Sequence, residues 1–433
     1  MAHQTNYNLD QRFDFTAAVK KAIFIVGGIG AFLLIVGILL PILGVGGDHA
    51  VHHGDTGTHD AFHWTQRLFA NLWINNVYFI GIGIIGVFFF AIQYAAQAGW
   101  SAGLLRVMIS FGYWLPVGAI LMVISFFVVN HDVFHWTHSY IFDANSPEFD
   151  RIINNKGNYF YWPLEKGSFP IFYIVRMLAF LGLWIFFFFK LKNLSIQEDL
   201  NGGVGYWYTI RKWSAIFLVV FAVTSSISAW DWVMSIDTHW FSTLFGWYVF
   251  SSWFVAGLSA MTLVAIFLRE RGYIMMVNEN HIHDMGKFIF AFSIFWTYLW
   301  FSQFLLIYYA NIPEESIYFV ERLNSDIYSP ILFLNLGLNF VLPFFVLMTR
   351  DAKRHTIFLK VVCSLIIFGH WVDFFLMVQP GTIGQNGGIG FMEIGMFLVF
   401  ASAVAFVVLT GLSKNLLVAK NNPMLEESYH HHI

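Results

Sequence analysis

Ten long apolar stretches constrain this chain more than any other feature of its sequence. A helix needs about 20 mostly apolar residues to cross a bilayer. The stretches cover residues 22–45, 71–96, 107–130, 168–189, 211–234, 241–268, 286–309, 327–349, 356–378 and 389–412. The sequence therefore predicts an all-α, polytopic membrane protein with ten transmembrane helices, in which residues 1–433 form a single integral membrane domain. The longest connections, 46–70 and 131–167, are predicted loops on one side of the membrane.

The composition argues against the soluble classes of protein. Of the 433 residues, 58% are hydrophobic and only 11% are charged, whereas soluble domains carry about 25% charged residues. The net charge of −3 gives no basic surface for nucleic acid. The single cysteine, Cys363, excludes a disulfide framework, a four-cysteine metal or iron–sulfur site and covalent haem attachment through Cys-x-x-Cys-His.

The distribution of lysine and arginine predicts the orientation of the chain. An even number of spans puts both termini on one side, and that side carries 17 of the 23 lysine and arginine residues. Cytoplasmic loops are enriched in these residues, so both termini are predicted in the cytoplasm. No small-residue cleavage site follows the first stretch, which is therefore read as a retained span. Aromatic residues near the predicted outer ends are expected at the headgroup layer: Trp64, Trp73, Trp136, Trp162, Trp240 and Tyr308.

One glycine motif and three groups of histidines have structural interpretations. Gly81, Gly83 and Gly86 match G-x-G-x-x-G, but no strand precedes them and no acidic residue follows at the expected distance, so they are read as small residues that let helices approach closely. His131 and His135 would share one helical face, with His138 following. No metal site is predicted from these, from His49, His52, His53, His59 and His63 of a solvated loop, or from the polar tail His430, His431 and His432.

Eight polar or ionisable side chains fall inside the apolar stretches: Arg176, Asp231, Gln303, Asn335, Asn339, His370, Asp373 and Glu393. An ionisable group in a span costs at least about 2.5–3.5 kcal/mol on insertion scales, unless it faces the bundle interior and finds a partner. All but Asn339 are predicted in the outer half of the membrane, and the inner half is expected to be nearly free of buried charge.

Two interpretations of these side chains stay open. They can pair with one another and with the backbone and so hold the bundle together. Alternatively, they line a polar pocket that opens outward, or the outer half of a proton path. His370 and Asp373 are three residues apart and project from one helical face, and a histidine beside a carboxylate suits proton transfer. Because only His370 lies well inside a span, the chain is not predicted to hold a haem with two axial histidines.

Spans two to five and six to nine show signs of an internal repeat. Trp230-Asp231-Trp232 lies in the fifth span and Trp371-Val372-Asp373 in the ninth, and a basic residue precedes each aspartate by 19 residues. Spans that are four apart run in the same direction. The pattern predicts a parallel repeat of two four-helix bundles, helices 2–5 and 6–9, with helices 1 and 10 flanking them.

Two longer motifs resemble a known family. The first runs from Trp230 to Thr243 and into Gly246-Trp247-Tyr248. The second combines His283-Asp284-Met285-Gly286-Lys287 with Trp300-Phe301-Ser302-Gln303 and the run from Tyr309 to Glu315. Together, over essentially all ten spans, they resemble the second NrfD-like (polysulfide-reductase-type) integral membrane subunit of bacterial alternative complex III, the ActF-type subunit.

The resemblance implies a function in respiratory electron transport. It implies a membrane subunit of a quinol:cytochrome c, or quinol:oxidase-linked, oxidoreductase in the bacterial inner (plasma) membrane, with 46–70 and 131–167 as periplasmic loops. No cofactor would be bound covalently; menaquinol is the candidate ligand, and haems and iron–sulfur clusters would lie in partner subunits. The implied partners are the paralogous NrfD-like subunit, an iron–sulfur subunit, c-type cytochrome subunits, phospholipids and a terminal oxidase, and no nucleic acid.

On this resemblance the polar residues receive candidate roles. His370, Asp373, Asp231 and Glu393 form a candidate proton relay on the periplasmic side, and Arg176, Gln303 and Asn335 a candidate quinol pocket. Whether the chain binds quinol or conducts protons stays open. The alternatives are a secondary transporter, which a parallel repeat and intramembrane charges would suit, and a purely structural scaffold subunit of the same complex.

Overall fold

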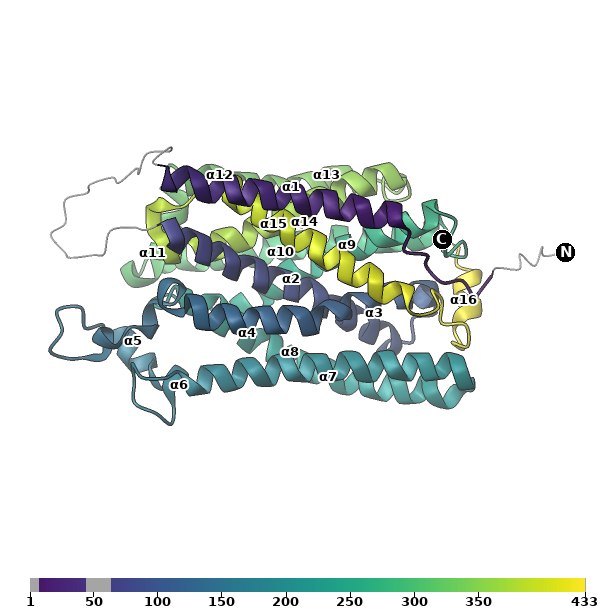
Figure 1. Ribbon diagram of the computed structural model, residues 1–433, viewed down its shortest axis with the longest axis horizontal. Helices are drawn as coiled ribbons and strands as arrows, with labels where there is room; N and C mark the ends of the chain where they lie inside the picture. Colours follow the sequence, from purple (N-terminus) through teal and green to yellow (C-terminus); the bar gives the residue numbers. More distant parts are fainter. Residues whose placement is uncertain (1–7, 44–63, 433) are drawn as a thin grey trace.

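The computed structural model describes residues 8–43 and 64–432. These residues form a bundle of long helices that lie side by side (Figure 1) and contain no β-strand. Ten helical segments among them are long and apolar enough to cross a membrane. The all-α, polytopic membrane fold with ten spans is therefore confirmed. The histidines of the predicted loop between His49 and His63 lie outside the described residues.

The ten spans are continuous helices except for two. The continuous ones are α1 (Ala17–Ile42), α2 (Trp64–Ala95), α7 (Ile171–Asn201), α8 (Val204–Trp232), α9 (Phe245–Glu270), α10 (Glu279–Ala310), α14 (Thr356–Ile383) and α15 (Phe391–Ser413). The third span joins α3 (Leu105–Ser110) to α4 (Trp114–Val133) through a 3₁₀ turn, and the eighth joins α12 (Tyr328–Leu336) to α13 (Leu342–Val346) through the π-helical turn Gly337–Val341. Shorter helices are α5 (Arg151–Lys156), α6 (Asn158–Tyr161), α11 (Pro313–Leu323) and α16 (Leu425–Tyr429).

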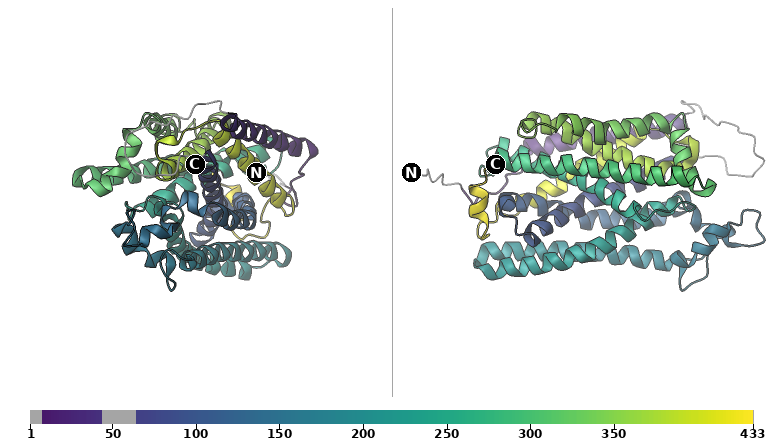
Figure 2. Two further views of the ribbon diagram at one scale, coloured as in Figure 1. Left: turned by 60° about the vertical axis from the view of Figure 1, so that its left-hand side comes forward. Right: turned by 180° about the vertical axis from the view of Figure 1, so that it is seen from behind.

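The spans pack in the two groups that the repeat predicted. Helices α2, α4, α7 and α8 pack together, and so do α9, α10, α12–α13 and α14. Helix α2 also packs on α9 and α14 and so joins the two groups, which makes it the most deeply buried span. Helices α1 and α15 pair with each other along their length and lie at the side of the bundle (Figures 1 and 2).

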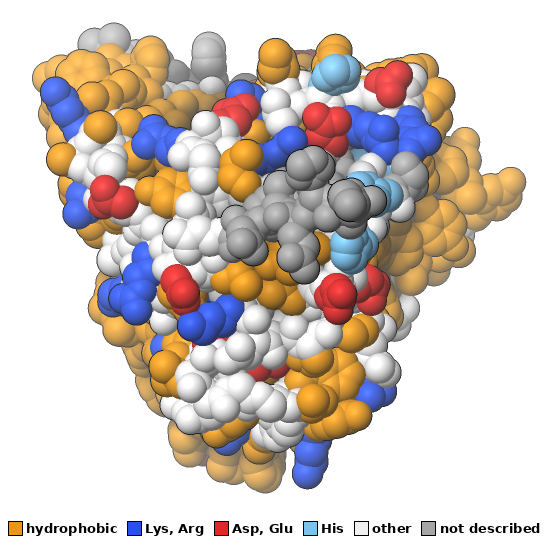
Figure 3. Space-filling view, turned by 90° about the vertical axis from the view of Figure 1, so that its right-hand side faces the viewer, with side chains coloured by type: hydrophobic (Ala, Val, Ile, Leu, Met, Phe, Trp, Pro, Cys, Tyr) orange, Lys and Arg blue, Asp and Glu red, His pale blue; other side chains and the backbone are white. Residues whose placement is uncertain are grey.

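The two ends of the bundle are formed by different elements. Both termini lie at one end, which we call the terminal end, and α5, α6 and α11 lie at the other, which we call the α11 end (Figures 1 and 2). Figure 3 shows lysine and arginine side chains spread over the terminal end, with hydrophobic side chains around its rim. Because the ten spans alternate in direction, the connections at the terminal end are those in which the sequence has most of its lysine and arginine residues. These residues are the basis of the predicted cytoplasmic face.

Half of the predicted interfacial aromatic residues do not face lipid. Trp73, Trp136 and Trp240 are at most 2% exposed. The Trp73 Nε1 atom donates to the carbonyl of Trp232 at 2.8 Å, and the ring of Trp136 stacks on Phe160 with 4.0 Å between centroids. The prediction was wrong for Trp73 because position along a span gives depth in the membrane but not the side of the helix. Trp136 and Trp240 lie in connecting segments, where Phe160 and Tyr318 stack on them. Exposed positions are found for two others, Trp162 and Tyr308.

The glycine motif lies where helices meet, as predicted. A Cβ atom on Gly81 would lie 2.0 Å from the indole ring of Trp253 on α9, and one on Gly86 would lie 2.4 Å from the carbonyl oxygen of Met108 on α3. The two glycines therefore let α2 approach both neighbours closely, and no dinucleotide-binding role is needed to explain them.

We expect Gly81→Ala to destabilise the protein by about 1–3 kcal/mol, because the added methyl group overpacks the contact with the buried Trp253. Gly182→Ala is the matched control, since a Cβ at Gly182 on α7 meets no atom within 4 Å. Thermal unfolding of both variants in detergent measures the difference. Equal melting temperatures for the two variants would show that α2 and α9 do not pack as described.

Candidate functional site

Asp373 is the centre of the candidate site. It lies on α14, is completely buried, and is reached by donors from three other helices. The Tyr248 hydroxyl on α9 and Asn335 Nδ2 on α12, at 3.0 Å, donate to Oδ1, and Trp296 Nε1 on α10 donates to Oδ2 at 2.9 Å. All three donors are neutral, and among the described residues Asp373 forms no ion pair. The second bundle thus surrounds one carboxyl group with hydrogen bonds but no cation.

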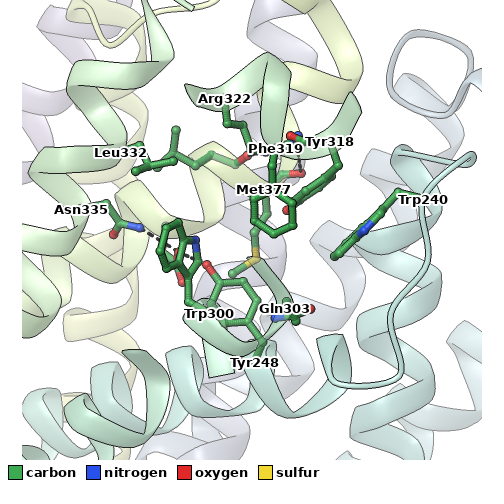
Figure 4. A pocket seen from close by; sticks show the side chains of 12 residues that line it. Trp240, Tyr248, Trp300, Gln303, Tyr318, Phe319, Arg322, Leu332, Asn335 and Met377 are labelled. Atoms are coloured by element: carbon green, nitrogen blue, oxygen red, sulfur yellow. Dashed lines mark hydrogen bonds between the residues drawn. The ribbon is translucent and has the colours of Figure 1, made fainter. Parts of the chain in front are cut away.

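Asp373 lines a cavity together with residues of α11, and Figure 4 shows side chains of this lining. The cavity has a volume of about 20 Å³, which is room for about one water molecule. The Oε1 atom of Gln303, which lines it, is buried without a hydrogen-bond partner. The other lining residues come from α9 to α12, α14 and the loop after α8: Trp240, Tyr248, Trp300, Tyr318, Phe319, Arg322, Leu332, Asn335, Asp373, Leu376 and Met377.

Arg322 on α11 lies in the outer part of this cavity. Its guanidinium donates to the carbonyls of Leu376 at 2.8 Å and Tyr318 at 2.6 Å, pairs with Asp237 at 3.2 Å, and lies 3.5 Å from the centroid of the Tyr318 ring. The ring of Tyr318 stacks in turn on Trp240 at 3.9 Å. Burial raises the pKa of Tyr318 to about 12, although Arg322 opposes the shift, so its hydroxyl stays protonated. Neither Arg322 nor Tyr318 was among the site residues predicted from the sequence.

His370 and Asn339 extend the polar cluster away from the cavity. His370 Nδ1 lies 3.0 Å from the Ser252 hydroxyl, its ring contacts the edge of Trp296, and its Nε2 atom is buried without a partner. Asn339 Nδ2 donates to Asn335 Oδ1 at 2.5 Å. Among the described contacts, none joins His370 directly to Asp373. The two residues project from one face of α14 into the same cluster, but they do not hydrogen-bond to each other.

Three of the predicted site residues lie elsewhere, in ion pairs. Arg176 on α7 makes two hydrogen bonds to Asp231 on α8, at 2.8 and 3.0 Å. Glu393 on α15 pairs with Arg67 on α2, with 2.6 and 2.8 Å between atoms. Each pair joins two helices. Arg176, Asp231 and Glu393 therefore fit the interpretation in which the buried polar groups pair and hold the bundle together. Asp373, Asn335 and Gln303 fit the interpretation in which these groups line a polar pocket.

A second, larger cavity opens at the α11 end. Its volume is about 340 Å³, near the lower end of the range of about 300–1,000 Å³ of small-molecule sites. Trp240 lines both cavities. The Lys156 ammonium is held at its wall by a 2.6 Å hydrogen bond to the carbonyl of Thr238. Half of the ten lining residues are aromatic: Asn155, Lys156, Tyr159, Phe160, Trp230, Met234, Ser235, Thr238, Trp240 and Phe241.

The histidines after the third span do not share a helical face. Helix α4 ends at Val133, and a separate 3₁₀ turn begins at His135, so that prediction was wrong. The chain turns back instead, and the ring of His138 lies 5.4 Å from that of His131 and 6.0 Å from that of His135, between centroids. Within residues 8–43 and 64–432, no group of three or more His, Cys, Asp or Glu has a geometry suited to a metal ion.

Charged side chains are also buried at the terminal end, beyond the ends that hydropathy predicted for the third span (107–130) and the fourth span (168–189). Glu198 and Asp199 on α7 and Arg106 on α3 are buried there. Hydropathy placed the end of the fourth span at 189, but α7 continues to Asn201. Phe187, Leu191 and Glu198 continue one buried stripe at helical spacing, and this signal could have revealed both the longer helix and its acidic end.

Neither the comparison with models of protein families nor the comparison with curated proteins finds a match to this chain. The family resemblance therefore rests on the sequence motifs alone.

We expect Arg176→Met to destabilise the protein by about 3–5 kcal/mol, because it leaves the Asp231 carboxylate buried without its cation. The double variant Arg176→Met/Asp231→Leu removes both charges and should recover most of the loss. Thermal unfolding and size-exclusion profiles in detergent measure both. A double variant that is as unstable as the single one would show that the pair does more than neutralise two buried charges.

The segment of residues 134–142, which follows α4, should become less stable as the pH falls below neutral. Burial, with the neighbouring histidine charges, lowers the pKa of His135 and of His138 from the usual 6.5. The unfolded loop therefore binds more protons than the folded one, and the stability that is complete above about pH 6.5 is lost as the pH falls toward the folded values.

Hydrogen exchange of residues 134–142, corrected for the intrinsic effect of pH, measures this loss of stability. The double variant His135→Gln/His138→Gln is the control, and its exchange should depend less on pH. Protection of the wild-type loop that does not change across this range would contradict the expectation.

Proposed function

We propose that this chain is a membrane subunit of a quinol-oxidising respiratory complex, in which Asp373 accepts and releases protons at the inner end of a cavity that opens to the periplasm. The observation that carries the proposal is the environment of Asp373. Its carboxyl group is completely buried, is held by neutral donors only, and lines a cavity.

A carboxyl group in these surroundings can change its protonation without breaking an ion pair. A buried carboxylate without a cation is costly, and ionisable groups inside membrane proteins commonly mark ion or proton pathways. Asp231 and Glu393 differ, since protonating either would leave Arg176 or Arg67 without its partner. Among the four predicted relay residues, Asp373 is therefore the one best suited to proton transfer.

The chemistry of quinol oxidation needs such an acceptor. A quinol that becomes a quinone loses two electrons and two protons; the electrons pass to redox centres that partner subunits supply, and the protons need a route to the periplasm. Gln303, Asn335 and Arg322 place polar groups along the cavity, and the buried, unpartnered Oε1 of Gln303 can bind a water molecule there. A water bound there would be one step of a proton route between Asp373 and the α11 end.

The larger cavity supports a lipid-soluble substrate. Its aromatic side chains suit the flat ring of a quinol such as menaquinol, and its size is that of a small-molecule site. Trp240 lines both this cavity and that of Asp373. The basic terminal end supports a cytoplasmic location of both termini in a bacterial inner membrane, and thus a periplasmic opening of both cavities.

Secondary transport has less support. Transporters of that kind commonly have broken helices at corresponding positions of their repeats. The π-helical turn between α12 and α13 interrupts the eighth span, whereas its counterpart α7 is continuous; the 3₁₀ turn interrupts the third span, whereas α10 is continuous. A scaffold subunit of the same complex remains the alternative that the following experiment tests.

We expect Asp373→Asn to lower quinol oxidation by the assembled complex about 100-fold or more, the usual contribution of a positioned proton acceptor, and to slow proton release equally. Asp326→Asn, which changes an exposed carboxylate at the same end, is the control and should behave as wild type. Turnover and proton release are measured on purified complex with normal subunit content. Unchanged values for both would leave the chain a scaffold only.

A further inference from the structure

A second buried carboxyl group without an ion pair lies at the terminal end. Arg106 on α3 pairs with Asp199 and donates to the carbonyl of Ser195 at 2.9 Å. Arg106 lies near the carboxyl groups of both Glu198 and Asp199, but among the described residues it forms an ion pair only with Asp199. Glu198 receives one side-chain hydrogen bond, from the Tyr94 hydroxyl on α2 at 3.0 Å, and its Oε1 atom is buried without a partner. Glu198 is completely buried, so it repeats at this end the situation of Asp373.

The chain after α15 folds back over this cluster. Asn421 Nδ2 donates to the carbonyls of Glu198 at 3.3 Å and Asp199 at 2.9 Å, and Asn422 Nδ2 donates to the Tyr94 hydroxyl at 3.1 Å. The Tyr94 oxygen therefore accepts one hydrogen bond while its proton is directed at Glu198. The C-terminal segment thereby fixes the direction of a short hydrogen-bonded chain that leads from Asn422 through Tyr94 to Glu198.

A cavity of about 10 Å³, about the space of one water molecule, adjoins this hydrogen-bonded chain. Tyr94 and Asn422 line it together with two further amides, Gln93 and Gln97. In the buried cluster behind it, four polar atoms have no partner: Glu198 Oε1, Asp199 Oδ1, and Nε and Nη1 of Arg106. Two acceptors and two donors that are left over in one buried cluster are the groups that internal water satisfies. The cluster is therefore built to hold water behind a polar entrance.

We propose that Glu198 is a second proton-exchanging carboxyl group, supplied with protons by water from the terminal face. Tyr94 passes its hydroxyl proton to Glu198 Oε2 and takes a proton from water in the cavity, and that water regains one from the bulk; the reverse sequence returns the proton. The charged groups that face Glu198 are Asp199 on its own helix and Arg106 on α3. Asp199 is tied to Arg106 and does not exchange, so a single proton is carried at this site.

The test labels the wild-type, assembled complex in native membranes with a hydrophobic carbodiimide, which reacts with carboxyl groups that carry a proton. Mass spectrometry then locates the adducts. We expect Glu198 to be labelled, with a yield that rises as the pH is lowered through neutral, while Asp199 in the same peptide stays unlabelled as the internal control. Absence of the adduct from Glu198 at every pH, or a yield independent of pH, would overturn the proposal.

Infrared spectroscopy after transfer to D₂O tests the role of Tyr94. The carbonyl band that Glu198→Gln removes is that of the Glu198 carboxylic acid, and Tyr94→Phe should slow its isotope shift about tenfold or more. An unchanged rate would remove Tyr94 from the route. The labelling of Glu198 should persist in Asp373→Asn, so this inference and the proposed function can fail independently.

Discussion

The interior of this protein depends on how each ionisable side chain is neutralised by a neighbouring helix. Lipid offers no water to a buried charge, so an unpaired charge must be matched by another span or kept neutral. Arg67 with Glu393, Arg106 with Asp199 and Arg176 with Asp231 each join two helices in this way. These pairs explain why the spans pack in a fixed arrangement although hydrophobic contacts alone do not drive helices together in a bilayer.

Two carboxyl groups depart from this rule. Asp373 and Glu198 are completely buried and have hydroxyl, indole or amide donors in place of a cation. Each lies close to a cavity, one toward the α11 end and one at the terminal end. The same physical constraint that makes the ion pairs structural makes these two groups chemically available, because a proton can neutralise them and no pair is lost.

The sequence predicted the number, order and grouping of the spans because hydropathy and the positions of basic residues report on depth in the membrane. It did not predict which side of a helix a residue faces, so Trp73 was expected at the headgroup layer and lies in the interior. It also did not predict partners: Asp373 and Asp231 look alike in sequence, and only the packing of α7 against α8 gives one of them an arginine. Glu198 was missed because it lies in a polar stretch that continues a helix.

The internal repeat gives the difference between the two aspartates a physical origin. Asp231 on the fifth span pairs with Arg176 on the fourth, and Asp373 on the ninth accepts a hydrogen bond from Asn335 on the eighth, four spans further on. The pair of the fourth and fifth spans thus has Arg176 as the donor to its aspartate. The corresponding pair of the eighth and ninth spans has Asn335 in that place. An amide keeps the hydrogen bond but removes the charge that would hold the carboxylate ionised. The aspartate of the first bundle is therefore held in an ion pair, whereas that of the second is held, among the described residues, by neutral hydrogen-bond donors only.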